Sequence, residues 1–287
     1  MQLIKLSTIV FLISFSSYAQ RNFDQVTIET VKLTDHVYML IGSGGNIGVS
    51  AGEDGVFIID DQFAPLTPKI LEAIKKLSDE PIKIVMNTHH HGDHTGGNEN
   101  FGKLGATIMA HDNVRKRLKA KNPKEALPVI TFNDKLHVQM NGEQVVAFHI
   151  ENAHTDGDAM LYFTKSNVLH TGDTYFNGRY PYIDLNSGGS VNGYINAVKA
   201  GLMLIDEDTK IIPGHGHLST KTEYKTFLKM LETIKANILK EIASNKTEDE
   251  VASNSSITTA YDALGYGNGF INSEKIRRTF YRSLKGR

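Results

Sequence analysis

Residues 88–94 read Thr-His-His-His-Gly-Asp-His and follow closely on the strand-like run Ile82–Met86. Imidazole and carboxylate groups bind Zn²⁺ and similar ions without redox chemistry, and crowding them together is costly unless a cation is bound. In an extended chain every second side chain points the same way, so His89 and His91 can chelate one ion. The end of this strand is therefore a candidate metal site.

Asp93 and His94 follow the turn of the same stretch and could hold a second ion beside the first. A polar loop that is merely rich in histidine, or a tract that scavenges metal without chemistry, has the same composition. The two-metal site differs from the histidine-rich loop and the scavenging tract because it requires further ligands from the rest of the chain. A short stretch cannot complete two four-coordinate shells, so a two-metal site needs distant ligands.

Three further candidates each come after a strand-like run, and they are His154, Asp173 and His215. Strands that end at one edge of a sheet bring such residues to a common point. The chain has no cysteine, so only oxygen and imidazole ligands are available. Thiol nucleophiles and cysteine-ligated zinc are excluded for the same reason.

Taken in order, His-x-His-x-Asp-His, His-Thr-Asp-Gly-Asp, Thr-Gly-Asp and Pro-Gly-His-Gly resemble the motifs of the metallo-β-lactamase superfamily, over roughly residues 26–240. The metal ligands that this resemblance implies are His89, His91 and His154 for a first ion, and Asp93, His94 and His215 for a second.

Asp173 matches the family position whose carboxylate bridges the two ions in glyoxalase II, lactonase and phosphodiesterase relatives. Lactamases with a cysteine ligand carry that cysteine here, so the resemblance excludes a site of their type. Flavodiiron relatives place a glutamate where His91 stands, which disfavours dioxygen reduction. Asp60 matches a family aspartate that supports the site from below, although a turn residue has the same appearance. The other histidines, among them His90, are interpreted as surface or core residues.

The resemblance implies an α/β (α+β) fold, a four-layer αββα sandwich with the site along one edge. The predicted catalytic domain spans residues 20–243, and residues 244–287 form a helical C-terminal extension. Within the extension, the polar stretch 245–256 is expected to be a linker or an exposed turn. Ile276, Phe280 and Leu284 recur every fourth position, which predicts an amphipathic helix.

The N-terminal residues 1–19 have the order of a secretory signal peptide: Lys5, an apolar core over 6–15, and small residues before Ala19. The core is far shorter than the roughly 20 residues of a membrane span, so we expect cleavage after Ala19 and no stable membrane anchor. This predicts a periplasmic or secreted protein. The formal net charge of −1 disfavours a nucleic-acid partner, which needs a basic surface. Oligomeric state is left open.

The loop of residues 174–193 is aromatic and rich in glycine, and it follows Asp173 directly. Its position predicts that it lines the substrate cleft. The candidate contacts are Tyr175, Arg179, Tyr180 and Tyr182. Alternatively, the aromatic residues pack the loop on the core.

These features predict a secreted hydrolase with two Zn²⁺ ions per chain, although such ligands also accept Mn²⁺ or iron. A hydroxide shared by the ions would attack an ester, lactone, thioester or amide of a small molecule, with β-lactams among the candidates. Asp93 would orient that hydroxide. The alternatives are a lactonase or glyoxalase II-like thioesterase and, from another class, a non-catalytic metal-binding module.

Overall fold

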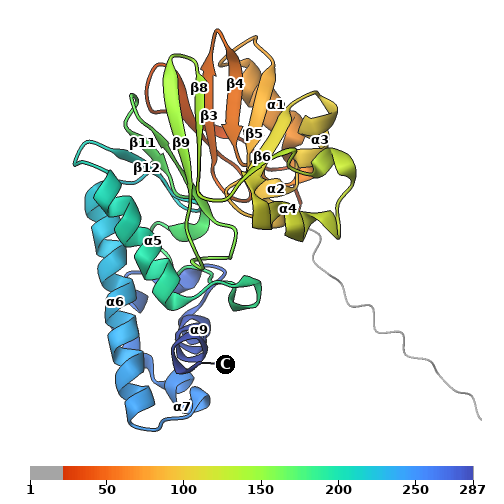
Figure 1. Cartoon of the computed structure of the whole chain (residues 1–287). Coiled ribbons are helices and arrows are strands. Elements are labelled where there is room, and N and C mark those ends of the chain that lie inside the picture. Colours follow the sequence, from red (N-terminus) through yellow and green to blue (C-terminus); the bar gives the residue numbers. More distant parts are fainter. Residues whose placement is uncertain (1–21, 287) are drawn as a thin grey trace, which may run out of the picture.

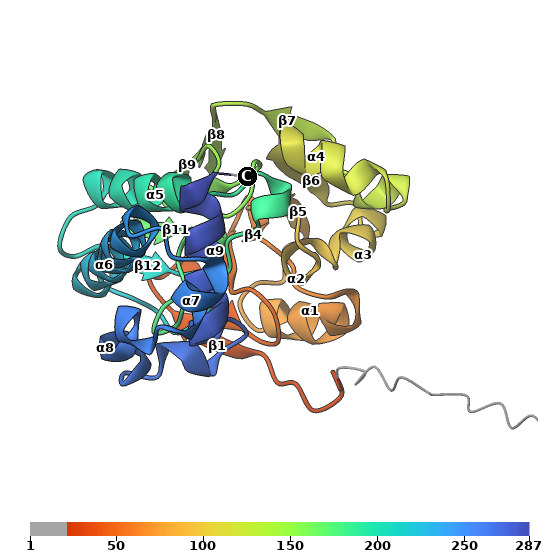
Figure 2. The same cartoon turned by 90° about the horizontal axis from the view of Figure 1, so that it is seen from below.

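The computed structural model describes residues 22–286, so the predicted signal peptide, residues 1–19, lies outside the described part of the chain. Two β-sheets lie face to face, and helices cover the outer face of each (Figures 1 and 2). The predicted αββα sandwich is confirmed, and the predicted helices of the C-terminal region are present.

The first sheet is antiparallel through its first four strands and parallel through the rest. Its order is β1 (Glu29–Lys32), β2 (Val37–Ile41), β3 (Ile47–Gly52), β4 (Gly55–Ile59), β5 (Ile82–Met86), β6 (Thr107–His111) and β7 (Ile130–Phe132).

The second sheet is antiparallel except for the pair β11 and β12. Its order is β12 (Lys210–Ile212), β11 (Val168–His170), β10 (Ala159–Phe163), β9 (Glu143–His149) and β8 (Lys135–Met140).

The helices of the described residues divide between the two outer faces and the C-terminal region. They are α1 (Thr67–Lys75), α2 (Gly92–Thr95), α3 (Asn98–Lys103), α4 (Asp112–Lys119), α5 (Val191–Leu204), α6 (Lys221–Ala243), α7 (Glu248–Ser253), α8 (Thr259–Asp262) and α9 (Ser273–Lys285). In Figure 2, α1, α3 and α4 lie on one side of the sandwich and α5 and α6 on the other.

Three apolar layers hold the sandwich together. Between the sheets, Phe57 of β4 meets Phe163 of β10 edge to face, with ring centroids 6.4 Å apart. Outside the first sheet, Ile70 and Ile74 of α1 join the residues of β3 and β4. Outside the second sheet, α5 and α6 share a core with the C-terminal helices. Burial of such side chains contributes roughly 1.5–3 kcal/mol each.

Strand direction places the candidate ligands together. Strands β4 and β5 are parallel neighbours, and so are β11 and β12. Strand β9 runs the same way as β11 because both are antiparallel to β10. Within each sheet the carboxyl ends of these strands thus open on one edge. Residues that follow β5 in the first sheet and β9 and β11 in the second have ligand atoms within 4.8 Å of one another, so the two edges meet.

The C-terminal region differs from its prediction in one stretch. Residues 245–256, expected to be a linker or exposed turn, contain α7. A capping box between Thr247 and Glu250 begins this helix, and Val251 and Ala252 are buried against its neighbours. The polar composition hid the helix because only one short face of it is apolar. The amphipathic prediction for the last helix holds, since Ile276 and Phe280 of α9 are fully buried.

None of the helices in residues 22–286 is both long enough and apolar enough to span a membrane.

Candidate metal centre

Three imidazoles converge to form what we call the first donor trio: His89, His91 and His154. The Nδ1 of His91 lies 3.1 Å from Nε2 of His89 and 2.9 Å from Nε2 of His154. His89 and His154 are almost completely buried. Nitrogens this close match the ligand spacing around a tetrahedral ion with metal–nitrogen distances of roughly 2.0–2.1 Å.

A second donor trio lies beside it and consists of Asp93, His94 and His215. The Oδ2 of Asp93 lies 3.9 Å from Nε2 of His94 and 3.5 Å from Nε2 of His215. Asp93 and His94 belong to the short helix α2, which turns the chain sharply after His91. That turn separates the second pair of ligands from the first.

Asp173 lies between the two trios. Its Oδ1 faces the second trio, 3.1 Å from Nε2 of His94 and 3.4 Å from Nε2 of His215. Its Oδ2 faces the first trio, 3.5 Å from Nε2 of His154 and 3.8 Å from Nε2 of His89. The structure thus brings all seven predicted ligands together, with one carboxylate shared between the two groups.

Two atoms of this cluster show that the residues fit a cation. The Nε2 of His94 and the Oδ1 of Asp173 are buried and lie 3.1 Å apart, but neither has hydrogen-bond geometry with the other or with any other described residue. A buried polar atom without a partner costs roughly 1–3 kcal/mol, so such atoms call for an unseen partner. The donors are only imidazole nitrogens and carboxylate oxygens, a set that suits Zn²⁺ and accepts Mn²⁺ or iron.

The charges of the site also favour a cation. Burial lowers the pKa of His154 to about 4, which keeps this imidazole neutral and able to act as a ligand. For His94, burial acts the same way, but the carboxylates of Asp173, Asp60 and Asp93 outweigh it and raise the pKa well above its usual range. A position that attracts a proton attracts a metal cation for the same electrostatic reason.

In each of these imidazoles, the ring nitrogen that does not face the donor cluster makes a hydrogen bond to another part of the protein. Nδ1 of His94 is 2.7 Å from Oδ2 of Asp60, and Thr88 donates its N–H and its hydroxyl to the same carboxylate. Nδ1 of His154 donates to the carbonyl oxygen of Tyr182 at 2.8 Å. These contacts fix each ring in the orientation a ligand requires.

Sequence reasoning missed two carboxylates that complete this support. Asp184 accepts from Nε2 of His91 at 3.1 Å and from the N–H groups of Asn186 and Ser187. Burial alone would raise the pKa of Asp184, but these hydrogen bonds hold it below its usual range. Asp158 accepts from the N–H of His154 at 2.6 Å. Only its place in His-Thr-Asp-Gly-Asp could have drawn attention to Asp158, and nothing in the sequence pointed to Asp184.

His90 lies outside both trios, as its interpretation required, although it is not a free surface residue. Burial lowers its pKa to about 3, and its Nε2 lies 3.5 Å from the hydroxyl of Ser187. His90, His91 and Asp184 have ligand atoms within 4.8 Å of one another. The Nε2 of His91 is already engaged by Asp184 there, so this group supports the first trio.

A cavity of about 640 Å³, here called the metal cavity, opens above the two trios. His91, Asp93, Asp173 and His215 form its floor. Of the four predicted substrate contacts, Arg179 and Tyr182 line its wall. Tyr180 borders the cavity as well, but its side chain is almost fully buried in the core outside the second sheet.

Tyr175 does not belong to that wall. It is fully buried, its ring packs on Tyr224 and Phe227, and its hydroxyl is 2.8 Å from that of Ser219. The alternative interpretation of this loop, in which aromatic residues pack it on the core, therefore describes Tyr175. Tyr175 is buried because it ends the turn that contains Asp173, at a point where the chain packs against α6.

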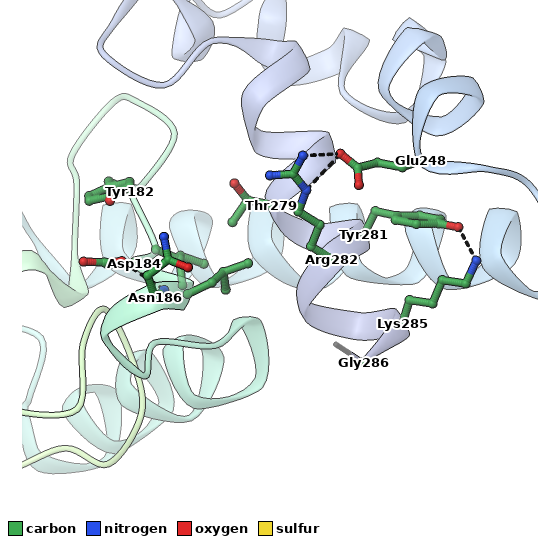
Figure 3. Close-up of a pocket in the computed structure, with 11 residues that line it drawn as sticks. Tyr182, Asp184, Asn186, Glu248, Thr279, Tyr281, Arg282, Lys285 and Gly286 are labelled. Carbon is green, nitrogen blue, oxygen red and sulfur yellow. Dashed lines mark hydrogen bonds and ion pairs between the residues drawn. The ribbon is translucent and has the colours of Figure 1, made fainter.

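Tyr182 also borders a second pocket, of about 370 Å³, on the far side of its loop. Figure 3 shows Tyr182, Asp184 and Asn186 on one side of this pocket and Thr279, Arg282 and Lys285 on the other, with Arg282 directed to Glu248 and Lys285 to Tyr281. The loop that carries the support for His91 is thus placed between the metal cavity and helix α9.

The C-terminal region contributes to the metal cavity itself. Phe270 and Ile271, which precede α9, line its wall. Sequence reasoning did not identify them, because a Gly-rich interruption between helices carries no sign of what it packs against.

Comparison with known proteins agrees with the residues. A family model described as the metallo-beta-lactamase superfamily matches residues 40–223. The hydroxyacylglutathione hydrolase of Pelagibacter ubique is 31% identical over 159 residues, which cover 53% of this chain and 59% of that protein. The 2,4-dinitroanisole O-demethylase subunit alpha of a Nocardioides species is 25% identical over 131 residues, 44% of this chain and 40% of that protein. The matched segments thus span well under two thirds of these relatives.

Solved structures show the same fold. A metallo-beta-lactamase from Pontibacter korlensis superposes with a TM-score of 0.64 at 17% identity, over 72% of this chain and 99% of that one. The matched region holds the first and second donor trios and Asp173. From its motifs, its fold and its family match, this chain belongs to the metallo-beta-lactamase superfamily.

Proposed function

We propose that the protein is a hydrolase that uses two divalent metal ions to cleave an ester, lactone, thioester or amide bond of a small molecule. The observation that carries this proposal is the position of Asp173, with one oxygen toward each donor trio. When bound, two such ions lower the pKa of a water molecule and polarise the carbonyl group that it attacks.

Asp93 is the acidic residue best placed to handle protons. Its side chain is 27% exposed, against 5% for Asp173, and it lines the metal cavity. Its carboxylate can accept a proton from the attacking water and return it to the leaving group. His91 and His215 also line the cavity floor, and each belongs to one of the two donor trios that would bind the metal ions. No side-chain nucleophile is needed.

The curated relatives favour a thioester as the bond that is cleaved. The relative with 31% identity is named a hydroxyacylglutathione hydrolase, which is a thioester hydrolase by name. The solved lactamases are 17% identical to this chain, so their likeness supports the fold alone and does not favour β-lactams as substrates. β-Lactams are therefore the second candidate, after thioesters. Asp173, in the place of the cysteine of cysteine-containing lactamases, weighs against that candidate.

Metal analysis and a substrate panel test the proposal. We expect about two zinc ions per purified chain and hydrolysis of at least one of a thioester, a lactone and a chromogenic cephalosporin. Asp93→Asn and His89→Ala should abolish hydrolysis. His217→Ala is the matched control, because His217 lies close to His215 in sequence but outside both trios.

The same experiment separates the alternatives. Metal binding with no hydrolysis of any substrate would favour a non-catalytic metal-binding module. Fewer than two ions per folded chain would contradict the two-metal scheme. Reconstitution of metal-stripped protein with Zn²⁺, Mn²⁺ or Fe²⁺ then identifies the ion that restores the highest activity.

We also propose export to the periplasm or the medium, based on the composition of residues 1–19. Cell fractionation, with mass spectrometry of the mature N-terminus, tests this proposal. Cleavage after Ala19 in the exported fraction is expected, and a chain that keeps residues 1–19 in the cytoplasm would contradict it.

A further inference from the structure

The wall of the metal cavity combines an exposed aromatic ring with an exposed cation. Phe270 is 74% exposed, and among the exposed large apolar side chains of the described residues it alone lines this cavity. Its ring meets that of Tyr182 edge to face, with centroids 5.7 Å apart. The next residue, Ile271, is buried in the core shared with α5 and α6. The backbone is thus anchored at Ile271 while the Phe270 ring stays at the cavity.

Arg179 is the one lysine or arginine among the described residues that line this cavity. Its side chain is exposed, and its guanidinium makes no ion pair or hydrogen bond with any residue in 22–286. The other charged side chains of the cavity, Asp93 and Asp173, face the metal-binding atoms. A free guanidinium is suited to bind a carboxylate through two parallel hydrogen bonds.

The C-terminal region holds this wall in place. The hydroxyl of Tyr180 donates to Oδ1 of Asp262 at 2.7 Å, and its N–H donates to the carbonyl of Tyr266 at 3.0 Å. Asp262 also accepts from Ser273 and from Thr258. The loop that carries Arg179 and the segment that carries Phe270 are therefore tied together, and the second of them lies beyond the matched family region.

We propose that Phe270 and Arg179 select the substrate: an amphiphilic anion whose apolar acyl or aryl group packs on Phe270 and Tyr182 while its carboxylate pairs with Arg179. This inference rests on the proposed hydrolase function. The Nζ of Lys275 lies 5.1 Å from the centroid of the Phe270 ring, and an apolar group placed on the rest of this ring removes from water a surface that the fold leaves exposed. The scissile carbonyl would then lie over Asp93 and Asp173 on the cavity floor.

Binding of small ligands to the metal-loaded full-length protein tests the inference without catalysis. The probes are 4-phenylbutyrate, its uncharged amide, and butyrate, measured by isothermal titration calorimetry. We expect 4-phenylbutyrate to bind most tightly. Phe270→Ala should weaken it roughly tenfold and leave butyrate unchanged, because the variant removes only the apolar contact. Arg179→Gln should weaken it roughly tenfold and leave the amide unchanged.

Two variants control for nonspecific effects. Leu264→Ala removes an exposed apolar side chain of the same segment that does not line the cavity, and Lys240→Gln removes a distant exposed cation. Both should bind like the wild type. Equal affinity for the three probes, or affinity for 4-phenylbutyrate that Arg179→Gln leaves unchanged because the carboxylate binds the metal alone, would overturn the inference.

A hydrolysis assay distinguishes failure of the substrate selection by Phe270 and Arg179 from failure of the proposed hydrolase function. Thioesters of thioglycolate with acetyl or phenylacetyl groups share one scissile bond and differ only in the apolar group. Hydrolysis of both with equal kcat/KM would leave the hydrolase proposal standing and overturn the selection by Phe270. Selective binding without hydrolysis of any panel substrate would overturn the hydrolase proposal alone.

Discussion

At the scale of single residues, each metal-facing imidazole of the first trio also has a contact through its second nitrogen. Nε2 of His91 faces Asp184, Nδ1 of His154 faces the carbonyl of Tyr182, and Nδ1 of His89 is 3.1 Å from the hydroxyl of Thr88. Because that hydroxyl donates to Asp60, it accepts from His89. The tautomers that leave the metal-facing nitrogens free are thereby set before any ion binds.

Replacing Asp184 tests the value of this support. Asp184→Asn keeps the size of the side chain but removes the charge that holds His91, so metal affinity of the first trio should fall roughly 10–100-fold. Competition with a chromophoric chelator measures the change. Asp35→Asn, at an exposed aspartate far from the centre, is the control. Unchanged affinity in Asp184→Asn would mean that the contact does not orient His91.

His111 should make the fold sensitive to acid. Its ring is buried and stacks on His149 with centroids 3.8 Å apart, and burial, with a smaller contribution from His149, lowers the pKa of His111 to about 4. An unfolded histidine titrates near pH ~6.5, so the folded state binds fewer protons between these values. The contribution of His111 to the free energy of unfolding is therefore fully present above its pKa in the unfolded state. It is lost as pH falls from there toward its pKa in the folded state.

The variant His111→Asn isolates this contribution. Asparagine can still accept from the N–H of Asn113 at the start of α4 but cannot be protonated. Between pH 7 and 5 the wild type should lose roughly 1–2 kcal/mol more of unfolding free energy than the variant. Urea denaturation at both pH values measures the difference, with His137→Asn as an exposed control. Parallel losses in both proteins would exclude His111 as the cause.

At the scale of elements, helix α5 supports the loop that carries His154. Gly193 lies in the first turn of α5, against the backbone just before His154. A Cβ at this position would come within 1.9 Å of the carbonyl oxygen of Asn152. Only glycine allows the helix to approach this closely. Arg117 of α4 holds the other end of the loop through two 2.7 Å contacts with Asp156.

Gly193→Ala should therefore separate α5 from this loop. We expect a loss of ~1–3 kcal/mol in unfolding free energy, since the added methyl group meets backbone that cannot rotate away. Metal affinity should fall as well, because His154 moves with the loop. Thermal unfolding and chelator competition measure the two effects. Asn196→Ala, on the exposed face of the same helix, should change neither, and a Gly193→Ala protein with wild-type affinity would contradict the proposed support.

At the scale of the whole molecule, the C-terminal helices belong to the same core as the second sheet. Val251, Ile276 and Phe280 pack in one cluster with Tyr194 of α5 and Phe227 of α6. Figure 1 shows α7 and α9 beside the lower half of α6. A segment built into a shared core is expected to unfold with the rest of the protein.

Ile276→Ala tests this expectation. Loss of a fully buried side chain should cost ~2–5 kcal/mol and lower the single unfolding transition of the entire chain. Circular dichroism of the helices and fluorescence of the tyrosines should report one midpoint. Glu274→Gln on the exposed side of α9 is the control. A separate early transition that leaves the metal centre intact would show that residues 244–287 fold on their own.

Much of the fold could be predicted because its strands carry strong local signals. The runs before His89, Asp173 and His215 are rich in β-branched residues, and each appears as a strand close to its predicted position. The helix α7 was missed because its only buried residues, Val251 and Ala252, occupy a single turn. Tyr175 and Tyr182 look alike in sequence, and one is core while the other lines the cavity.

The sequence by itself determined which candidate metal ligands this protein offers: their residue types, the absence of thiols among them, and the family motifs that order them. Only the tertiary structure decided which residues distant in sequence contact those histidines and carboxylates. Asp184 meets His91 and Phe270 meets Tyr182 through the packing of separate elements. A ligand's identity is a local property of the chain, whereas its orientation and the shape of the cavity above it depend on contacts that form only when the layers assemble.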